Sequence, residues 1–316
     1  MGSPQPKLGL SHLIGMADLK RLASRDAKAS RRANEQFPHT GLYGPGGLGK
    51  TVFTDSMSVD LGYWRYMIEG AMCKTRKAAQ DHLRQGCEEA KSRGKRLLFF
   101  IDEAHRLSPE AQEALYIPML TGRFEGYSTF TVFAATTHPH MLLGPFKSRL
   151  RNEWYFSRYE HYDIERMIVK WWRKNNMKWD RKSVELVAQR SLGIPRNGYN
   201  LSQKVRNEVL ARGGERVIRE QDCLITFELE GIDEIGLNRD QVHYLRILSS
   251  TDAARGIGGI AGALDRDVEV VEDSIEPVLL SLGFVDRTHS GRVITDEGKK
   301  HLNRVDSVRA GLNYAS

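Results

Sequence analysis

The chain has 316 residues, of which 40% are hydrophobic, and its 47 Lys and Arg residues outnumber its 40 Asp and Glu residues, giving a net charge of +7. This composition is typical of an ordinary soluble protein with two or three domains, and it excludes a repeat or low-complexity protein. The modest basic excess is compatible with a polyanionic partner such as nucleic acid but does not require one.

The cysteines and the apolar runs exclude further classes. Cys73, Cys87 and Cys223 lack paired spacing, which argues against a disulfide framework and against a four-ligand zinc site. The first residues lack the pattern of a secretory signal, and no apolar run approaches the length that crosses a bilayer. We therefore expect a cytoplasmic protein without a membrane partner.

The predicted elements begin with a short turn and one amphipathic helix within residues 9–37, a pattern that Pro38 ends. Short apolar runs then alternate with helical patterns as far as residue 156. Such alternation predicts an α/β domain, residues 1–157, with a parallel sheet and helices on both faces. Its strands are expected at residues 40–44, 96–102 and 130–137, and its helices at residues 51–62, 75–94 and 108–122.

The first predicted strand leads into GPGGLGKT, residues 44–51, which matches the phosphate-loop pattern G-x-x-x-x-G-K-[ST] and precedes a predicted helix. Its glycines let backbone N–H groups converge on phosphates, where a Cβ would block the approach. We expect Lys50 to reach the β- and γ-phosphates of ATP and Thr51 to bind Mg²⁺. The residues expected to hold the nucleotide here are Gly44, Pro45, Gly46, Gly47, Leu48, Gly49, Lys50, Thr51 and Val52.

Two carboxylates follow the second apolar strand. Asp102 ends this strand, which places it at the carboxyl edge of the sheet beside the phosphate loop, where it can bind Mg²⁺. Glu103 can orient and polarise the attacking water, although an acidic residue at a helix start is the alternative. His105 fits an exposed loop histidine as well as it fits a functional one.

Hydroxyl and guanidinium groups follow the third strand. Thr136 and Thr137 end it, where a hydroxyl could contact the γ-phosphate, although threonine is also a common strand residue. Arg149 and Arg151 in FKSRLR fit no local pattern. They could complete the site of a neighbouring subunit, or they could form a solvated basic turn.

The remainder of the chain predicts two smaller domains. Residues 158–235 have apolar residues at helical spacing, which predicts a small all-α domain. Residues 236–316 contain two or three helices and then two short strands joined by a three-residue turn, which predicts a winged helix.

The charges of the winged helix suggest how it would hold DNA. The helix before the hairpin, residues 267–283, carries five acidic residues, so phosphates would repel it from the major groove. Arg287 and Arg292 flank the turn of the hairpin and suit contacts with the DNA backbone. A winged helix that serves only protein contacts is the alternative.

Five segments of the chain together carry a family resemblance. They are GPGGLGKT, LLFFIDEAHRLSPEAQEALYIPML, FAATTHPHML, GIPRNGYNLSQKVR and IEPVLLSLGFVDRTHSGRVIT. In this order they resemble the RuvB family of AAA+ motors, which drive branch migration of Holliday junctions. The likeness extends from about residue 14 to residue 302, and its last two segments are the most specific.

The resemblance implies an AAA+ P-loop ATPase domain, an all-α lid and a C-terminal winged helix. It places the sensor threonine on Thr137, the trans-acting arginine finger on Arg149, and the nucleotide-sensing arginine of the lid on Arg196. RuvB proteins form hexameric rings around duplex DNA, so the same assembly is implied here. The matching catalytic positions are Lys50, Asp102, Glu103, Thr137, Arg149 and Arg196, and those that border the adenine are Ile14, Gly15 and Tyr162.

Two segments depart from the family. RuvB proteins carry a long β-hairpin before the sensor strand that docks their partner RuvA, and only residues 121–130 fill that interval here, which calls RuvA docking into question. The basic stretch at residues 73–96 is longer than in the family. It could follow a DNA backbone, or it could be a solvated helix of mixed charge.

Two functions are compatible with these features. The main expectation, favoured by the lid and the wing, is a DNA-dependent ATPase that translocates duplex or branched DNA and drives branch migration in recombination and repair. The alternative, favoured by the short interval at residues 121–130, is a nucleotide switch that assembles on DNA and loads other proteins without branch migration.

Overall fold

The computed structural model describes residues 7–127, 129–251 and 253–313. It divides into two compact units, which we describe separately. Unit 1 consists of Met1–Asp163 with Ile194–Arg196, and unit 2 consists of Ile164–Gly193 with Asn197–Ser316.

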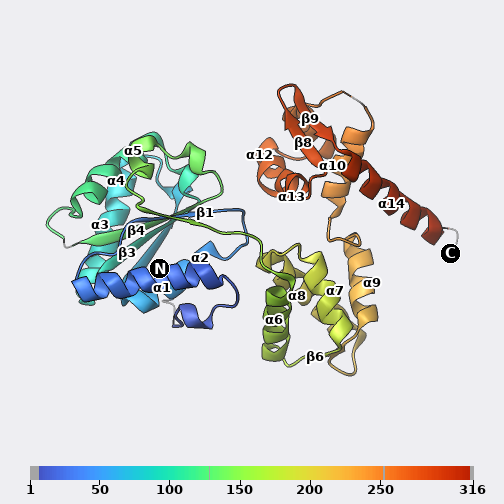
Figure 1. Ribbon diagram of the computed structural model, residues 1–316, viewed down its shortest axis with the longest axis horizontal. Coiled ribbons are helices and arrows are strands. Elements are labelled where there is room, and N and C mark those ends of the chain that lie inside the picture. Colours follow the sequence, from blue (N-terminus) through green and yellow to red (C-terminus); the bar gives the residue numbers. More distant parts are fainter. Residues whose placement is uncertain (1–6, 128, 252, 314–316) are drawn as a thin grey trace. The chain divides into compact units, whose positions relative to one another are not determined.

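Unit 1 contains a five-stranded sheet with strand order β2-β3-β4-β1-β5, in which every pairing is parallel (Figure 1). The central strands β3 and β4 are almost entirely buried, as expected when helices cover both faces of a parallel sheet. The predicted α/β class is therefore confirmed. The strands are β1 (Thr40–Tyr43), β2 (Trp64–Glu69), β3 (Leu97–Asp102), β4 (Phe130–Thr136) and β5 (Asn152–Tyr155).

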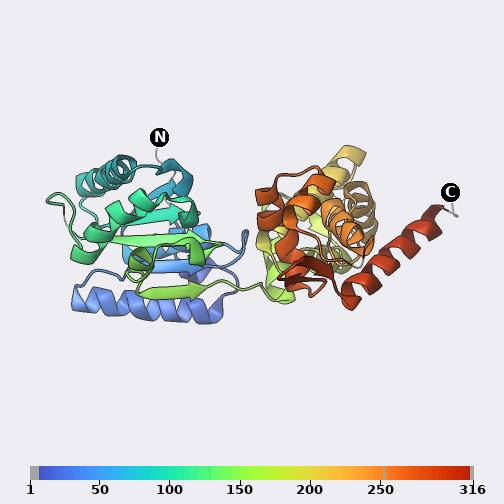
Figure 2. The same ribbon diagram turned by 90° about the horizontal axis from the view of Figure 1, so that it is seen from above.

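Helices cover both faces of this sheet (Figure 2). One face packs on α1 (Ala17–Ala33) and α2 (Lys50–Leu61), and the other packs on α3 (Arg76–Ser92) and α4 (Pro109–Thr121). Alternate residues of β3 enter the two cores, because successive side chains of a strand point to opposite faces. The short helix α5 (Gly144–Lys147) adds Phe146 to the second core.

Two strands of the sheet, β2 and β5, were not predicted from the sequence. Both lie at the edges of the sheet, where a strand has only one neighbour and needs fewer apolar residues. Each also carries charged side chains, including Arg65, which forms an ion pair of 3.0 Å with Asp55 of α2. Their charged, half-buried sequences therefore lack the continuous apolar run that marks the central strands.

The first part of unit 2 is helical, as predicted. Trp172 of α6 is fully buried, and its ring lies 6.2 Å from that of Trp179, which gives the aromatic segment at residues 171–179 a core role. A short parallel strand pair, β6 (Lys178–Trp179) and β7 (Val217–Ile218), was not expected. The helices are α6 (His161–Lys174), α7 (Arg181–Arg190), α8 (Pro195–Arg212) and α9 (Glu220–Glu230).

The second part of unit 2 is a winged helix, as predicted. Apolar side chains of its helices and of β8 form one core, which contains the fully buried Tyr244. The acidic helix passes through a π-helical turn, Val271–Ile275, between α12 (Val268–Val270) and α13 (Glu276–Ser281). The other elements are α10 (Arg239–Ser249), α11 (Ile257–Leu264), the wing strands β8 (Val285–Thr288) and β9 (Gly291–Ile294), and α14 (Asp296–Asn313).

His39 connects three elements of unit 1 through a buried, neutral ring. Its Nδ1 accepts the backbone N–H of Val132 at 2.9 Å, and its Nε2 lies 3.1 Å from the carbonyl oxygen of Met119. Nε2 therefore carries the proton. Burial lowers the pKa of His39 from 6.5 to about 4.

This histidine makes the stability of unit 1 depend on pH. In the unfolded chain the imidazole takes up a proton below its ordinary pKa, whereas in the folded chain it stays neutral until about pH 4. Stability should therefore fall as the pH drops from about 6.5 toward 4, by about 3 kcal/mol from this group. Urea unfolding at several pH values measures the slope. His39→Asn keeps an acceptor for Val132 but cannot titrate, and an equal slope in both proteins would contradict this expectation.

Candidate active site

The phosphate loop connects β1 to α2 and contains glycines in conformations that other residues rarely adopt. Gly47 and Gly49 have φ angles of 79° and 91°, which side chains rarely adopt. A Cβ on Gly47 would also lie 2.9 Å from the side chains of Ile194 and Arg196. The loop therefore wraps the start of α2, where backbone N–H groups and the helix dipole favour an anion.

Lys50, the first residue of α2, is buried within this loop. Its Nζ donates to the carbonyl oxygens of Gly44 at 2.7 Å and Pro45 at 2.9 Å. Burial lowers the pKa of Lys50, the carboxylates of Glu103 and Asp102 oppose this effect, and Arg196 reinforces it. These four charged side chains therefore belong to one site.

Thr51 and Asp102 form the side of this site that suits a divalent cation. Thr51 donates from Oγ1 to Oδ2 of Asp102 at 2.9 Å, and Asp102 accepts the backbone N–H of Glu103 with its other oxygen at 3.1 Å. A hydroxyl and a carboxylate are the hard oxygen ligands that Mg²⁺ prefers. The structure thus brings together the two residues predicted to bind the metal.

Glu103 lies in a constrained turn directly after β3. Its φ angle is 48°, in the left-handed region, and its side chain is 41% exposed. Gly70, which follows β2, packs so closely beneath this turn that a Cβ there would overlap the Glu103 carbonyl oxygen. Gly70 was missed in the sequence because the strand that precedes it was missed.

Histidine and threonine side chains lie next to Glu103. The side chain of His105 is only 9% exposed, so His105 is not an exposed loop histidine. Its Nδ1 lies 3.4 Å from Oε2 of Glu103 and 2.9 Å from Oγ1 of Thr136, which is fully buried. The neighbouring Thr137 is partly buried and lies 2.8 Å from Nδ1 of His138. Thr136 at the end of β4 is thus connected to Glu103 through His105.

Arg196 and an aromatic residue border the phosphate loop. The N–H of Arg196 donates to the Gly47 carbonyl oxygen at 3.3 Å. Tyr159 donates from its hydroxyl to the Leu48 carbonyl oxygen at 3.3 Å. The Tyr159 ring also lies so close to Gly15 that a Cβ there would be 2.7 Å from it.

The remaining predicted nucleotide-binding residues differ in exposure. Ile14, which precedes Gly15, is partly buried, as is Thr51, whereas Pro45 is exposed. Leu48 is fully buried, whereas Val52 and Tyr162 are 55% and 66% exposed. Tyr159 was not singled out in the sequence, because nothing in the local pattern distinguishes it from Tyr162, three residues later.

Arg149 follows α5 and packs on α4. Its guanidinium lies 5.0 Å from the centre of the Tyr116 ring, and one of its terminal nitrogens donates to the Tyr116 hydroxyl at 3.0 Å. Its Nε is buried and has no hydrogen-bond partner among the described residues. Within the described ranges, no hydrogen bond joins Arg149 to the phosphate loop or to Asp102. The guanidinium therefore keeps donor capacity for another group.

In the wing, Arg287 and Arg292 face each other across β8 and β9 and both donate to Glu276, which is fully buried. Oε1 of Glu276 accepts from Arg292 at 2.7 Å and from the Tyr244 hydroxyl at 2.6 Å, and Oε2 accepts from Arg287 at 3.0 Å. Burial opposes ionisation of Glu276, but these three hydrogen bonds together outweigh it and lower its pKa. The hydrogen bonds of Arg287 and Arg292 to Glu276 therefore hold the wing strands against the acidic helix.

The two wing arginines differ in their access to solvent. The Arg287 side chain is 52% exposed, whereas that of Arg292 is 16% exposed and also donates to Glu272 at 3.1 Å. Much of their positive charge is neutralised by Glu276, a contact that the local sequence around the wing does not reveal.

Residues 122–127, which follow α4, are held against α3. Arg84 of α3 donates to both carboxylate oxygens of Glu125, at 2.7 and 2.8 Å, and also pairs with Asp81. The Tyr127 hydroxyl donates to Glu88 at 3.1 Å. Some charged side chains in the stretch at residues 73–96 therefore form ion pairs and hydrogen bonds within unit 1.

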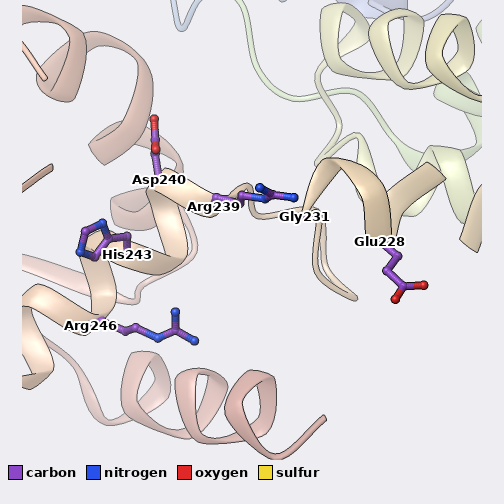
Figure 3. Close-up of a pocket in the computed structure, with 6 residues that line it drawn as sticks. All are labelled: Glu228, Gly231, Arg239, Asp240, His243 and Arg246. Carbon is purple, nitrogen blue, oxygen red and sulfur yellow. The ribbon is translucent and has the colours of Figure 1, made fainter. Parts of the chain in front are cut away.

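Unit 2 contains a cavity of about 630 Å³ between α9 and α10. Figure 3 shows that its side chains point in different directions and do not converge. Asp240 is paired with Arg266, and Arg246 with Asp306, so its charges are largely satisfied. We do not assign this cavity to the site. It is lined by Glu228, Gly231, Arg239, Asp240, His243 and Arg246.

Comparisons with known proteins match both the phosphate-loop domain and the winged helix. A family model described as "ATPase family associated with various cellular activities" matches residues 40–158, and "RuvB C-terminal winged helix domain" matches residues 234–303. A Holliday junction branch migration complex subunit RuvB from Wolbachia (strain wRi) is 30% identical over 310 residues, which cover 93% of each chain. The chain belongs to the RuvB family.

Other members of the RuvB family show the same similarity. A Synechococcus protein named Holliday junction branch migration complex subunit RuvB 2 is 29% identical over 312 residues, covering 93% of this chain and 81% of the relative. The solved structure of the Thermotoga maritima RuvB motor superposes with a TM-score of 0.85 at 26% identity, covering 95% of this chain and 98% of that one. The predicted RuvB resemblance is confirmed, and the phosphate loop belongs to a nucleotide-binding ATPase domain. Among the described helices, none has the length and apolarity to span a bilayer.

Proposed function

We propose that this chain is an ATP-hydrolysing motor that translocates duplex DNA and drives branch migration of Holliday junctions. One observation carries the proposal: a complete phosphate-loop site and a winged helix occur in one chain that matches RuvB along 93% of its length. The Wolbachia and Synechococcus relatives are named as subunits of the branch migration complex, which places them in recombination and repair.

Each residue of the site has a role that its position supports. Lys50 and the loop N–H groups bind the phosphates of ATP, and Thr51 with Asp102 holds Mg²⁺. Such an ion would supply positive charge against the negative charge that develops on the phosphate oxygens. Glu103 orients and polarises the attacking water, and its exposed side chain leaves room for that water.

The sensing residues surround the same loop. Thr137 contacts the γ-phosphate and Arg196 senses the nucleotide, which its bond to Gly47 supports. We propose that Ile14, Gly15 and Tyr162 border the adenine, together with Tyr159, whose contacts with Gly15 and Leu48 support this role.

Assembly completes the site. We propose that the chain forms a hexameric ring in which Arg149 reaches the nucleotide of the next subunit. Within the described ranges Arg149 bonds to Tyr116 and not to its own subunit's loop, which supports a role outside that loop. An arginine placed in this way stabilises the charge of the transition state.

For DNA, we propose that Arg287 and Arg292 act unequally. Arg287 keeps half of its side chain exposed and contacts the phosphate backbone, whereas Arg292 is mostly enclosed by Glu272 and Glu276 and holds the wing in place. Backbone contacts carry no sequence information, which suits a protein that moves along DNA.

The short turn at residues 122–127 supports a further proposal about partners. Its tip is fixed to α3 by the bonds of Arg84 to Glu125, so no long hairpin projects from it. We propose that RuvA does not dock here in the manner of the family. The same feature favours the alternative function, a nucleotide switch that assembles on DNA and loads other proteins.

A synthetic four-way junction tests the motor against the switch. We expect the purified protein with ATP and Mg²⁺ to convert the junction into its two duplex products. Lys50→Ala should lose this activity, because it removes the ammonium that binds the phosphates. RuvA from a relative should not accelerate the reaction.

Two results would contradict these proposals. ATP hydrolysis that is stimulated by DNA while every junction stays intact, with or without RuvA, would rule out the motor and support the switch. A large acceleration by RuvA would show instead that docking occurs without the hairpin.

A further inference from the structure

The His105 side chain lies between residues that follow two neighbouring strands. Glu103 and His105 follow β3, whereas Thr136 ends β4, the strand that pairs with β3. Nδ1 of His105 is 3.4 Å from Oε2 of Glu103 and 2.9 Å from Oγ1 of Thr136. One ring nitrogen thus faces both the residue proposed to polarise water and the strand that carries the proposed sensor.

The two contacts of Nδ1 favour one position for the proton of this ring. A carboxylate only accepts hydrogen bonds. An unprotonated Nδ1 beside Glu103 would therefore place its lone pair next to a lone pair of the carboxylate oxygen, which is unfavourable. Oγ1 of Thr136 already accepts the backbone N–H of His138 at 2.9 Å and has a second lone pair for His105. A proton on Nδ1 satisfies both contacts, because the ring can then donate toward both oxygens.

The surroundings of His105 restrict its rotation. Its side chain is 9% exposed, and the ring of His138 packs edge-on against it with 5.0 Å between the ring centres. The backbone of the Glu103 turn is also restrained, because Gly70 packs directly beneath it. With the backbone held, the direction of the Glu103 carboxylate depends mainly on its side-chain contacts.

We propose that His105 is a positioning residue for ATP hydrolysis. Its Nδ1–H fixes the Glu103 carboxylate in the direction that polarises the attacking water, and the buried Thr136 hydroxyl in turn holds the imidazole. This coupling connects the end of the sensor strand to the water-polarising group, so a shift of β4 on nucleotide binding changes the direction of Glu103. The inference rests on the hydrolytic function proposed above.

Variants of His105 separate positioning from nucleotide binding. His105→Ala should lower kcat for ATP hydrolysis by about 10- to 100-fold, because a small misplacement of a catalytic group costs this much. KM and the affinity for a fluorescent ADP analogue should change by less than about twofold, since the direction of the Glu103 carboxylate affects the hydrolysis step and not the binding of phosphate.

Two amide variants supply matched controls. The amide nitrogen of His105→Asn stands one carbon beyond Cβ, as Nδ1 does, so this variant should recover most of the kcat. The amide nitrogen of His105→Gln stands one bond further out, where Nε2 would be, and should remain as slow as His105→Ala. His140→Ala removes an exposed histidine from the segment that follows β4 and should behave like the wild type.

A double-mutant cycle tests the connection to the sensor strand. Thr136→Val removes the hydroxyl and keeps the shape, and it should lower kcat severalfold in the wild type but have no further effect in His105→Ala. In the nucleotide-free protein, ¹⁵N shifts of the imidazole should show the proton of His105 on Nδ1. Both readouts depend on the coupling and not on fold stability alone.

The outcomes distinguish this inference from the proposed function. If the wild type hydrolyses no ATP with or without DNA, the proposed function fails, while the imidazole shifts still test the position of the proton. If the wild type is active but His105→Asn is as slow as His105→Ala, or the Thr136 and His105 effects are additive, the positioning role is overturned. A parallel loss of ADP affinity in His105→Ala would also overturn it.

Discussion

Glu103→Gln is expected to abolish ATP hydrolysis while nucleotide binding and DNA binding survive. The expected loss of kcat is about 10²- to 10⁴-fold, the contribution typical of a general base. Glutamine has the shape of glutamate but cannot accept a proton from water or carry the charge that polarises it. Thr51 and Asp102, which are proposed to hold Mg²⁺, keep their own hydrogen bond in this variant.

Phosphate release with and without duplex DNA measures this prediction, together with binding of a fluorescent nucleotide. The Glu103 side chain is 41% exposed, so the substitution should leave thermal stability almost unchanged. Glu110→Gln alters an exposed carboxylate in the first turn of α4 and serves as the control that should retain activity. Retention of more than about a tenth of the wild-type rate by Glu103→Gln would exclude Glu103 as the water-polarising residue.

Glu276→Ala is expected to destabilise the winged helix by about 3–5 kcal/mol, the range for breaking a buried ion pair from one side. The variant leaves the Arg292 guanidinium, which is 16% exposed, and the buried Tyr244 hydroxyl without their shared acceptor. It also weakens the attachment of the wing to the acidic helix, because Arg287 and Arg292 lose their shared carboxylate while the bond of Arg292 to Glu272 remains. Glu276→Gln, which keeps the shape and part of the hydrogen bonding, should lose less.

Urea unfolding followed by circular dichroism measures the effect. Glu269→Ala removes an exposed carboxylate from the same acidic segment and should change stability by less than about 0.5 kcal/mol. The stabilisation from Glu276 should also depend on pH. Because the folded pKa of Glu276 is lowered, its contribution is present above the ordinary pKa of glutamate and is lost as the pH falls through the folded value. Equal losses in Glu276→Ala and Glu269→Ala would show that the network does not hold the wing.

Much of the fold and the centre of the site could be predicted from the sequence, because the responsible patterns are local. The three central strands are continuous apolar runs, since a parallel strand covered on both faces has no polar side. The phosphate loop is one contiguous segment, and Asp102 with Glu103 follows a strand whose end can be located by its last apolar residue. Once a parallel sheet is predicted, its topology brings these segments to one edge.

Other features could not be predicted because they depend on how distant segments pack. The edge strands β2 and β5 carry charged residues and resemble loops until a neighbouring strand pairs with them. The local sequence pattern does not distinguish Tyr159 from Tyr162. Only the path of the chain after β5 brings Tyr159 into contact with Gly15 and the phosphate loop.

The sequence by itself determined the family, the presence of a parallel-sheet domain, a small all-α domain and a C-terminal winged helix, and the residue types at the phosphate loop. The tertiary structure decided which neighbours modify those residues. His105 contacts a threonine 31 positions away, and Glu276 neutralises arginines 11 and 16 positions away. Such contacts depend on strand register and helix rotation. Apolar periodicity predicts which face of a strand or helix is buried, but it does not predict which side chains on that face contact each other.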